Sequence, residues 1–271
     1  MSHGAPAAKV KPLLIESIRE IRQLRRRLAE AQAPGAAAAE PIAIVGAGCR
    51  FPGGAEGVDA YWDFLRRGGD GVREIPAERW PADAYFDPRP GRSGRIYTRA
   101  AGIVEGVDRF DAEFFGISPR EAAATDPQHR LLLETAWEAL ENAALVPAAL
   151  QGTRTGIYVG LMGQDYSHLT HEPEAVDLYT GIGNLASVAA GRLAYWLGTH
   201  GPVMSIDTAC SSSLVAVHVA CRHLRSGEAD VALAGGVNLI LSPLVMAMIC
   251  AARMLSPDGR CKTFDRSADG F

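Results

Sequence analysis

The sequence predicts a layered α/β fold, and three observations support this prediction. Segments typical of short buried strands alternate along the chain with segments typical of helices. Of the 271 residues, 29 are glycine and 48% are hydrophobic, which suits a buried core with many tight turns. The net charge is only −4, because 27 Lys and Arg stand against 31 Asp and Glu. This balance argues against a chain-wide basic surface and therefore against bulk nucleic-acid binding.

The N-terminal 40 residues are the basic part of the chain. They carry a net charge of +3, which leaves −7 for the rest. Within them, 12–31 has no Gly or Pro in its interior and is predicted to be a helix. Alternating spacings of four and three, typical of a coiled-coil seam, join Leu14, Ile18, Ile21, Arg25 and Leu28. A helix of this length, about 30 Å, is marginal alone. An Ala-rich linker over 33–40 follows it, so we expect a partner helix; packing on the chain's own body is the alternative.

The first strand is predicted at 41–46, ahead of a glycine turn. Gly46 and Gly48 are spaced as in a dinucleotide-binding fingerprint, but Phe51 stands where the third Gly is needed. No helix is expected there to hold a pyrophosphate on its N-terminus. We therefore interpret the segment as a strand followed by a loop, and we expect a second, exposed loop at 83–98.

Two helices are marked by their starts. Ser118 and Asp126 are each followed by Pro, a residue that suits the first helical position, and each can cap the backbone N–H groups of a first turn. Farther along, 156–160 is predicted to be a short strand and 185–197 a mostly apolar helix. This order of elements again favours a layered α/β fold.

Residues 231–252 carry no charge over 22 positions, enough to cross a bilayer. Two adjacent glycines and a Ser-Pro pair interrupt the run, however. We interpret 231–234 as a buried strand of a parallel sheet and Ser242 as the cap of a new helix. The sequence therefore predicts no membrane span.

The cysteines point to a reducing compartment. Their number is odd and they form no C-x-x-C pair, so neither a disulfide framework nor a zinc site is expected. The N-terminus also lacks the apolar stretch of a secretory signal. We therefore expect a soluble, cytoplasmic protein. The five cysteines are Cys49, Cys210, Cys221, Cys250 and Cys261.

Cys210 is the candidate nucleophile. A predicted strand at 203–206 ends in small residues just before it, and an apolar helix begins just after it. Backbone N–H groups of a first helical turn and the helix dipole both favour a thiolate at such an elbow. The alternative is that Cys210 is a small buried hydrophobe, as free cysteines commonly are.

No histidine partner for this thiol is evident from spacing. His218 lies eight residues along the same helix, about 12 Å away along its axis, which is too far for a hydrogen bond. Spacing does not exclude four other histidines, but none has a motif around it that indicates a catalytic base, and we interpret each as a surface or satisfied core histidine. These are His129, His168, His171 and His200, with His223 still farther along the Cys210 helix.

Several segments together resemble the ketosynthase domain of modular type I polyketide synthases, within the thiolase-like superfamily. The resemblance runs from residue 40 to residue 271. The runs that carry it are EPIAIVG (40–46), CRFPGG (49–54), FDAEFFGISPREA (110–122), DPQHR (126–130), DTACSSSL (207–214) and KTFD (262–265).

The resemblance implies a thiolase-like layered α/β/α fold, of which 41–271 would be the N-terminal half. It implies that Cys210 accepts an acyl chain as a thioester from the phosphopantetheine arm of an acyl carrier protein. Decarboxylative condensation with a malonyl-type extender would follow, and the Cys210 backbone N–H would contribute to the oxyanion hole. No cofactor would be bound directly.

The resemblance also implies partners. The helix at 1–32 resembles the docking helices that receive the C-terminal tail of an upstream synthase polypeptide, and its arginines would meet acidic residues on that tail. Ketosynthases of the family are homodimers. Their dimer interface follows the strand that leads to the nucleophile, here Val203, Met204, Ser205 and Ile206.

One departure from the family bears on activity. The family's two catalytic histidines lie in His-Gly-Thr-Gly-Thr and Gly-His runs, and neither run occurs here. We therefore expect a fragment whose condensing activity needs the second half of the domain. Two alternatives stay open: a non-catalytic docking and scaffold piece, and a thiolase-like enzyme that uses coenzyme A thioesters.

Overall fold

The computed structural model describes residue 16 and residues 20–23, 40–163, 165–169 and 177–271. The chain forms two compact units, 1–43 and 44–271. In the first, residues 16 and 20–23 are helical and the predicted seam residue Ile21 is exposed. The other predicted seam residues, Leu14, Ile18, Arg25 and Leu28, lie outside the described residues.

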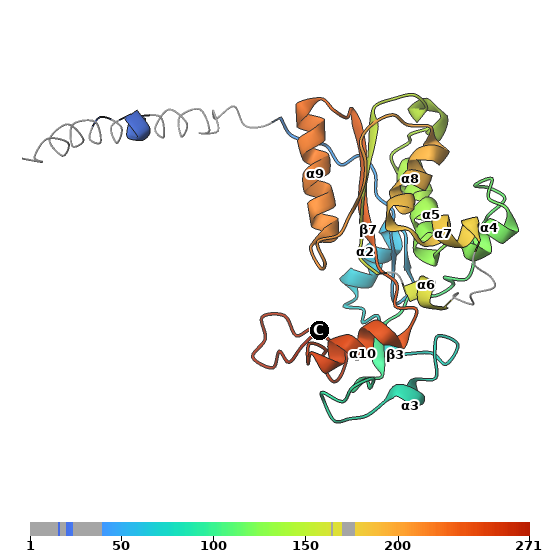
Figure 1. The fold of residues 1–271 in the computed structure, drawn as a ribbon, viewed down its shortest axis with the longest axis vertical. Coiled ribbons are helices and arrows are strands. Elements are labelled where there is room, and N and C mark those ends of the chain that lie inside the picture. The colour runs from blue at the N-terminus through green and yellow to red at the C-terminus, as the bar shows by residue number, and fades with distance from the viewer. Residues whose placement is uncertain (1–15, 17–19, 24–39, 164, 170–176) are drawn as a thin grey trace, which may run out of the picture. The chain divides into compact units, whose positions relative to one another are not determined.

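A three-stranded parallel sheet forms the centre of the second unit (Figure 1). Strand β5 (Thr155–Leu161) lies in the middle, between β6 (Val203–Ile206) and β7 (Val231–Val237). In this register Gly160 of β5 stands opposite Gly236 of β7. The strands predicted at 156–160, 203–206 and 231–234 are thereby confirmed. Because all three run the same way, their carboxyl ends meet at one edge of the sheet.

Helices cover both faces of this sheet, which confirms the layered α/β prediction. Helix α9 (Ser212–Ser226) packs on one face, while α5 (Pro127–Asn142) and α8 (Ala186–Leu197) lie on the other (Figure 1). Strand β7 is less buried than predicted, since Ala234 and Gly236 are exposed. Among the described residues no strand pairs with its free edge.

Successive side chains of β5 contribute to two different cores. Ile157, Val159 and Leu161 point to the α5 and α8 side and join the largest buried cluster. Tyr158 points the other way and packs against Ala216 and Ala220 of α9. A strand sends successive side chains to opposite faces, so one buried strand serves both helical layers.

Capped helix starts appear where the sequence predicts them. In α4 (Pro119–Ala124) the Ser118 hydroxyl accepts a hydrogen bond from Glu121 N, and in α5 Asp126 accepts one from Gln128 N. Helix α10 (Pro243–Ala251) is capped in the same way by Ser242. The charge-free run therefore divides into β7 and α10. Within the described part of the chain, no helix has the length and hydropathy needed to cross a membrane.

A second core lies below the sheet, where α10 packs against a small two-stranded antiparallel sheet (Figure 1). This small sheet pairs β3 (Val72–Glu74) with β4 (Ala100–Gly102). The prediction of an exposed loop at 83–98 is only partly correct. The segment contains most of the short helix α3 (Ala82–Tyr85) and buries Ile96, Tyr97 and Thr98. Ile96 and Tyr97 are buried because they pack in the core between this small sheet and α10.

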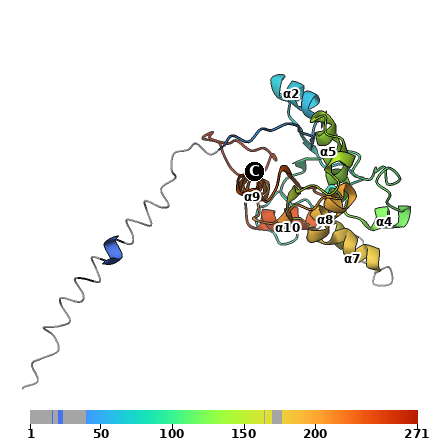
Figure 2. The same cartoon turned by 90° about the horizontal axis from the view of Figure 1, so that it is seen from above.

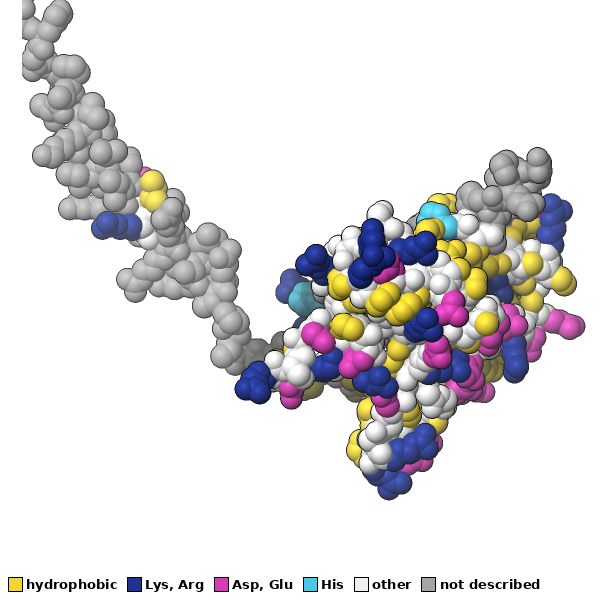
Figure 3. All heavy atoms as spheres, turned by 90° about the horizontal axis from the view of Figure 1, so that it is seen from below, with side chains coloured by type: hydrophobic (Ala, Val, Ile, Leu, Met, Phe, Trp, Pro, Cys, Tyr) yellow, Lys and Arg dark blue, Asp and Glu magenta, His cyan; other side chains and the backbone are white. Residues whose placement is uncertain are grey.

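Short elements complete the unit. Helices α4 and α7 lie side by side at its rim (Figure 2), where Arg120 and Asp177 form an ion pair at 2.7 Å. Charged side chains of both signs interleave with hydrophobic ones on the face of this unit seen in Figure 3. The remaining elements are β1 (Arg50–Phe51), β2 (Ala55–Glu56), α2 (Val58–Arg66), the 3-10 helix η1 (Pro147–Leu150), α6 (Asp165–Leu169) and α7 (Leu178–Asn184).

The prediction of a strand at 41–46 is wrong. Residues 40–49 have no regular secondary structure, and Ile44 is 90% exposed. An extended segment becomes a strand only when a neighbour takes its backbone hydrogen bonds, and none lies beside it among the described residues. Residues 46–48 lie against α5 instead, where Asn142 Oδ1 accepts a hydrogen bond from Ala47 N at 3.0 Å.

Candidate active site

The turn that carries Cys210 is held by its own small polar residues. Asp207 accepts a hydrogen bond from Ala209 N at 2.9 Å, and Ser212 Oγ accepts one from Thr208 N at 2.9 Å while donating to Ala209 O at 2.6 Å. Ala209 adopts a positive φ of 56°, a conformation that costs about 1–2 kcal/mol for a residue with a Cβ. This strained strand-to-helix turn leaves Cys210 exposed immediately before the N-cap of α9.

Two glycines let this turn lie directly on the sheet. A Cβ at Gly160 would stand 2.6 Å from Ser213 N, and a Cβ at Gly236 would stand 2.7 Å from Ser213 Cβ. The two glycines are paired across β5 and β7, so together they form a cradle for the first turn of α9. Any larger residue would push that turn, and Cys210 with it, away from the strands.

Cys210 opens into a cavity of about 900 Å³ at the carboxyl ends of the strands. The cavity reaches from the parallel sheet to α10 and β4, and its lining is mostly apolar. Ligands of open parallel sheets commonly bind at this edge. Residues that line it include Leu161, Met162, Gly163, Val237, Asn238, Met246, Met248, Ile249 and Met254.

Two buried polar side chains hold the loops around the cavity, and the sequence assigned a role to neither. Asp165 lies in the lining, where its Oδ2 accepts from Leu241 N at 3.1 Å and Ser242 N at 3.0 Å at the start of α10. Gln128 lies behind the lining at the start of α5. The DPQHR run was recognisable as a motif, but only the folded chain shows what its glutamine contacts.

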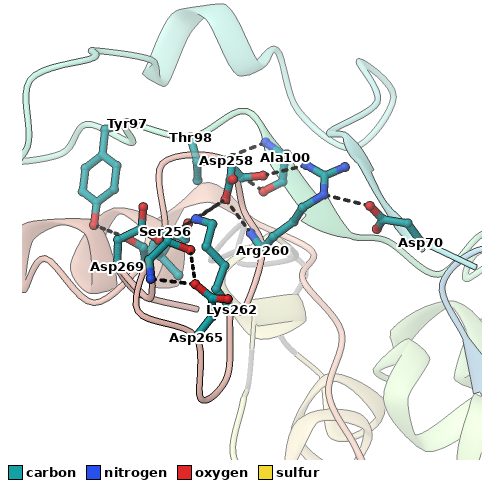
Figure 4. A network of polar contacts seen from close by, with 12 residues as sticks. Asp70, Tyr97, Thr98, Ala100, Ser256, Asp258, Arg260, Lys262, Asp265 and Asp269 are labelled. Atoms are coloured by element: carbon teal, nitrogen blue, oxygen red, sulfur yellow. Dashed lines mark hydrogen bonds and ion pairs between the residues drawn. The ribbon is translucent and has the colours of Figure 1, made fainter. Parts of the chain in front are cut away.

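A polar network fixes the segment that closes the far side of the cavity (Figure 4). Lys262 Nζ lies 2.7 Å from Asp269 Oδ1 and 3.0 Å from both Asp258 Oδ1 and the Ser256 hydroxyl. The hydroxyl of Ser256 and the ammonium of Lys262 lower the pKa of Asp258 to about 2, so the carboxylate stays charged at neutral pH. Gly259, beside this network, lines the cavity.

The network is anchored to the rest of the unit at two points. Tyr97 OH donates to Leu255 O at 2.7 Å, and Arg260 Nε donates to Asp70 Oδ2 at 2.7 Å (Figure 4). Leu255 also lines the cavity. The segment is therefore a fixed wall of the cavity.

The structure places the candidate cysteines, one histidine and the residues predicted at a dimer interface. Cys210 is exposed in the cavity, as the nucleophile interpretation requires, whereas Cys250 is buried. His168 lines the same cavity, which its sequence context did not indicate. The residues of β6 predicted at a dimer interface lie on an edge strand, where Val203 and Met204 are exposed and Ser205 and Ile206 half-buried. Within the described residues, no three His, Cys, Asp or Glu side chains are placed to hold a metal ion.

A parallel sheet between helical layers, with a cysteine on a strained turn at its carboxyl edge, is the arrangement expected of a thiolase-like α/β protein. Residues 39–271 match the family described as "Beta-ketoacyl synthase, N-terminal domain". The chain belongs to the beta-ketoacyl synthase family.

Its relatives are polyketide synthases. The chain is 54% identical over 233 residues to a phenolphthiocerol/phthiocerol polyketide synthase of Mycobacterium tuberculosis, covering 86% of this chain and 13% of that protein. It is 53% identical over 232 residues to a mycocerosic acid synthase-like polyketide synthase of Mycolicibacterium smegmatis, covering 85% and 11%. The chain thus spans about an eighth of the length of these relatives.

Solved ketosynthase domains share the fold. A cysteine-to-serine mutant of the ketosynthase from module 6 of the bacillaene synthase of Bacillus subtilis 168 superposes with a TM-score of 0.77 at 41% identity, over 84% of this chain and 38% of that one. An oxazolomycin ketosynthase domain from Streptomyces albus JA3453 gives a TM-score of 0.79 at 39% identity, over 84% and 39%.

Proposed function

We propose that this chain is the acyl-accepting part of a polyketide ketosynthase and that Cys210 is its nucleophile. The single observation that carries the proposal is the position of Cys210, exposed on a strained turn inside a large apolar cavity. An acyl chain is apolar and needs such a cavity, whereas its thioester carbonyl needs the nucleophile and N–H groups at the cavity mouth.

The first step is transfer of the acyl group. The Cys210 thiolate attacks the carbonyl of an acyl thioester on the phosphopantetheine of a carrier protein, and the Cys210 backbone N–H supports the oxyanion. The new bond joins Sγ to the acyl carbon, and the bond to the pantetheine sulfur breaks. The pantetheine thiolate leaves and takes up a proton. No cofactor bound by the chain itself is needed.

The second step is condensation. A malonyl-type thioester loses carbon dioxide, and the carbanion attacks the acyl carbon held on Cys210. The bond to Sγ breaks, the Cys210 thiolate is restored, and the product is a β-ketoacyl thioester on the carrier protein. The chain grows by two backbone carbons.

We propose two further partners. Strand β6 has a free outer edge among the described residues and exposed apolar side chains, which suits a homodimer interface. The basic segment 1–32 suits a docking helix for the acidic C-terminal tail of an upstream synthase. We place the protein in the cytoplasm, since the five cysteines of this chain form no disulfide pattern.

Acylation of Cys210 tests the function. The complete synthase polypeptide that contains this chain is incubated with an acyl-pantetheine thioester, and the adduct is located by mass spectrometry. We expect the acyl group on Cys210 and its loss in C210A, with unchanged labelling in C261A, because Cys261 is also exposed but does not line the cavity. Acylation that persists in C210A would refute the proposal. Labelling by coenzyme A thioesters alone would favour the thiolase-like alternative.

A further inference from the structure

Gln128 is a buried carboxamide that contacts both loops at the floor of the Cys210 cavity. It is 1% exposed and lies in the first turn of α5, two residues after the cap Asp126. It is not itself part of the cavity lining. Its contacts are therefore not made to a substrate but to the backbone that shapes the cavity.

The two loops follow neighbouring parallel strands. Gln128 Nε2 donates to Gly163 O at 2.9 Å, just after β5, and Gln128 Oε1 accepts from Leu239 N at 3.1 Å, just after β7. Nε2 also lies 3.3 Å from Asp126 Oδ2. Gly163 and Leu239 both line the cavity with Cys210. One side chain thus joins the two loops across the gap between their strands.

A carboxamide suits this position. One loop offers a carbonyl and the other an N–H, so the bridging side chain must both donate and accept. A carboxylate of the same shape would lose the donor and would also face the carboxylate of Asp126, whereas an aliphatic side chain of similar size would lose both bonds. Buried polar backbone groups without a partner move to find one, which would shift the loops.

We infer that Gln128 is a positioning residue that sets the width of the acyl cavity and hence which acyl chains Cys210 accepts. The inference rests on the proposed function. Without this bridge each loop can shift along the sheet edge, which changes the space beside Cys210 without touching the turn that carries it. The effect is therefore on the choice of acyl chain and not on the reactivity of the thiol.

Acyl loading by the complete synthase polypeptide, measured with acetyl-, butyryl- and octanoyl-pantetheine, tests the inference. In Q128L we expect the ratio of octanoyl to acetyl loading on Cys210 to change by about tenfold, since one methylene in an apolar pocket is worth about that much. Reaction of Cys210 with iodoacetamide should stay at the wild-type rate. Q151L is the matched control, because Gln151 is exposed beyond η1, and it should keep the wild-type ratio.

Hydrogen exchange gives the second measurement. The Leu239 amide should lose protection by about tenfold in Q128L, while the amides of β5 and β7 keep theirs. Q128E, which keeps the shape and loses the donor, should show the same changes if Q128L does not fold. Loading ratios equal to wild type in a folded variant would overturn the inference, as would unfolding of both variants. Absence of any acyl group on wild-type Cys210 would instead refute the proposed function, and the exchange data would still test the loop contacts.

Discussion

At the scale of single residues, Gly160 has the clearest consequence for the site. G160A places a Cβ against the backbone of Ser213, and we expect a loss of about 1–3 kcal/mol in the free energy of unfolding. Because the displaced turn carries Cys210, acylation in the complete polypeptide should fall about tenfold or more. Denaturant titration of the chain and mass spectrometry of Cys210 measure the two effects.

The matched control for this substitution is G191A. Gly191 lies inside α8, and a Cβ there meets nothing within 4 Å. The same chemical change should therefore raise the free energy of unfolding by about 0.5–1 kcal/mol, through helix propensity alone. Equal effects of the two substitutions would contradict the proposed cradle.

His129 makes the stability of the chain depend on pH. Burial lowers the pKa of His129 to about 4 from its ordinary value of 6.5, with Arg192 adding to the effect. Between these pH values His129 is protonated in the unfolded state but stays neutral in the folded state. The free energy of unfolding therefore falls as the pH drops from 6.5 toward 4. The loss attributable to this residue is about 3 kcal/mol at the lower end.

H129Q isolates this contribution. Burial raises the pKa of the neighbouring Asp126, which acts in the opposite direction, so the comparison is between variants and not along the wild-type curve. The difference between the urea midpoint at about pH 7 and that at about pH 4.5 should be larger for the wild type than for H129Q. H218Q changes an exposed histidine and should follow the wild type. Parallel curves for H129Q and the wild type would exclude His129 as the cause.

The residue scale also shows what sequence alone can predict. Cys210 was identifiable because its signal is local: a strand, small residues and a helix in direct succession. Gln128, Asp165 and Lys262 were not, because their roles depend on contacts that form only in the folded chain, most of them with distant residues. A residue that acts by joining distant loops has no local pattern to show it.

At the scale of elements, helix α9 is attached to the sheet by more than its apolar face. Tyr158 OH and His223 Nδ1 lie 2.8 Å apart and join the last turns of α9 to the middle of β5. Y158F removes one buried hydrogen bond, so we expect a loss of about 1 kcal/mol in the free energy of unfolding. Y195F, at a tyrosine that is 89% exposed, should change nothing measurable. A stable Y158F would mean that packing alone holds α9.

Elements could be predicted where residues close together in the sequence determine where the element begins. The capped helices α4, α5 and α10 begin where Ser118, Asp126 and Ser242 indicate. The segment 41–46 was mispredicted because a strand depends on a partner elsewhere, and a short apolar run ahead of a glycine turn does not show whether a partner is present. Local signals thus located the ends of helices better than the membership of the sheet.

At the scale of the whole molecule, the dimer interface proposed on β6 would link assembly to chemistry. Its outer edge has no partner strand among the described residues, and Val203 and Met204 are 40% and 37% exposed there. In a two-fold interface each substitution acts twice. V203D should therefore halve the mass of the complete polypeptide in sedimentation, by placing a carboxylate on each side of an apolar contact. V146D, at an exposed valine before η1, should keep the wild-type mass.

Loss of the proposed dimer should also affect Cys210, because Cys210 lies only four residues beyond the end of β6. The Ser205 hydroxyl donates to Ala186 O and ties one face of β6 to α8. The outer edge of the strand pairs with no strand among the described residues and would be covered by the proposed partner chain. Loss of the partner should loosen the strand and slow acylation of Cys210 in V203D, with V146D unaffected. A V203D protein that keeps the wild-type mass would refute β6 as the dimer interface. A monomeric V203D with wild-type acylation would show that the turn around Cys210 is set within one chain, by the cradle of Gly160 and Gly236.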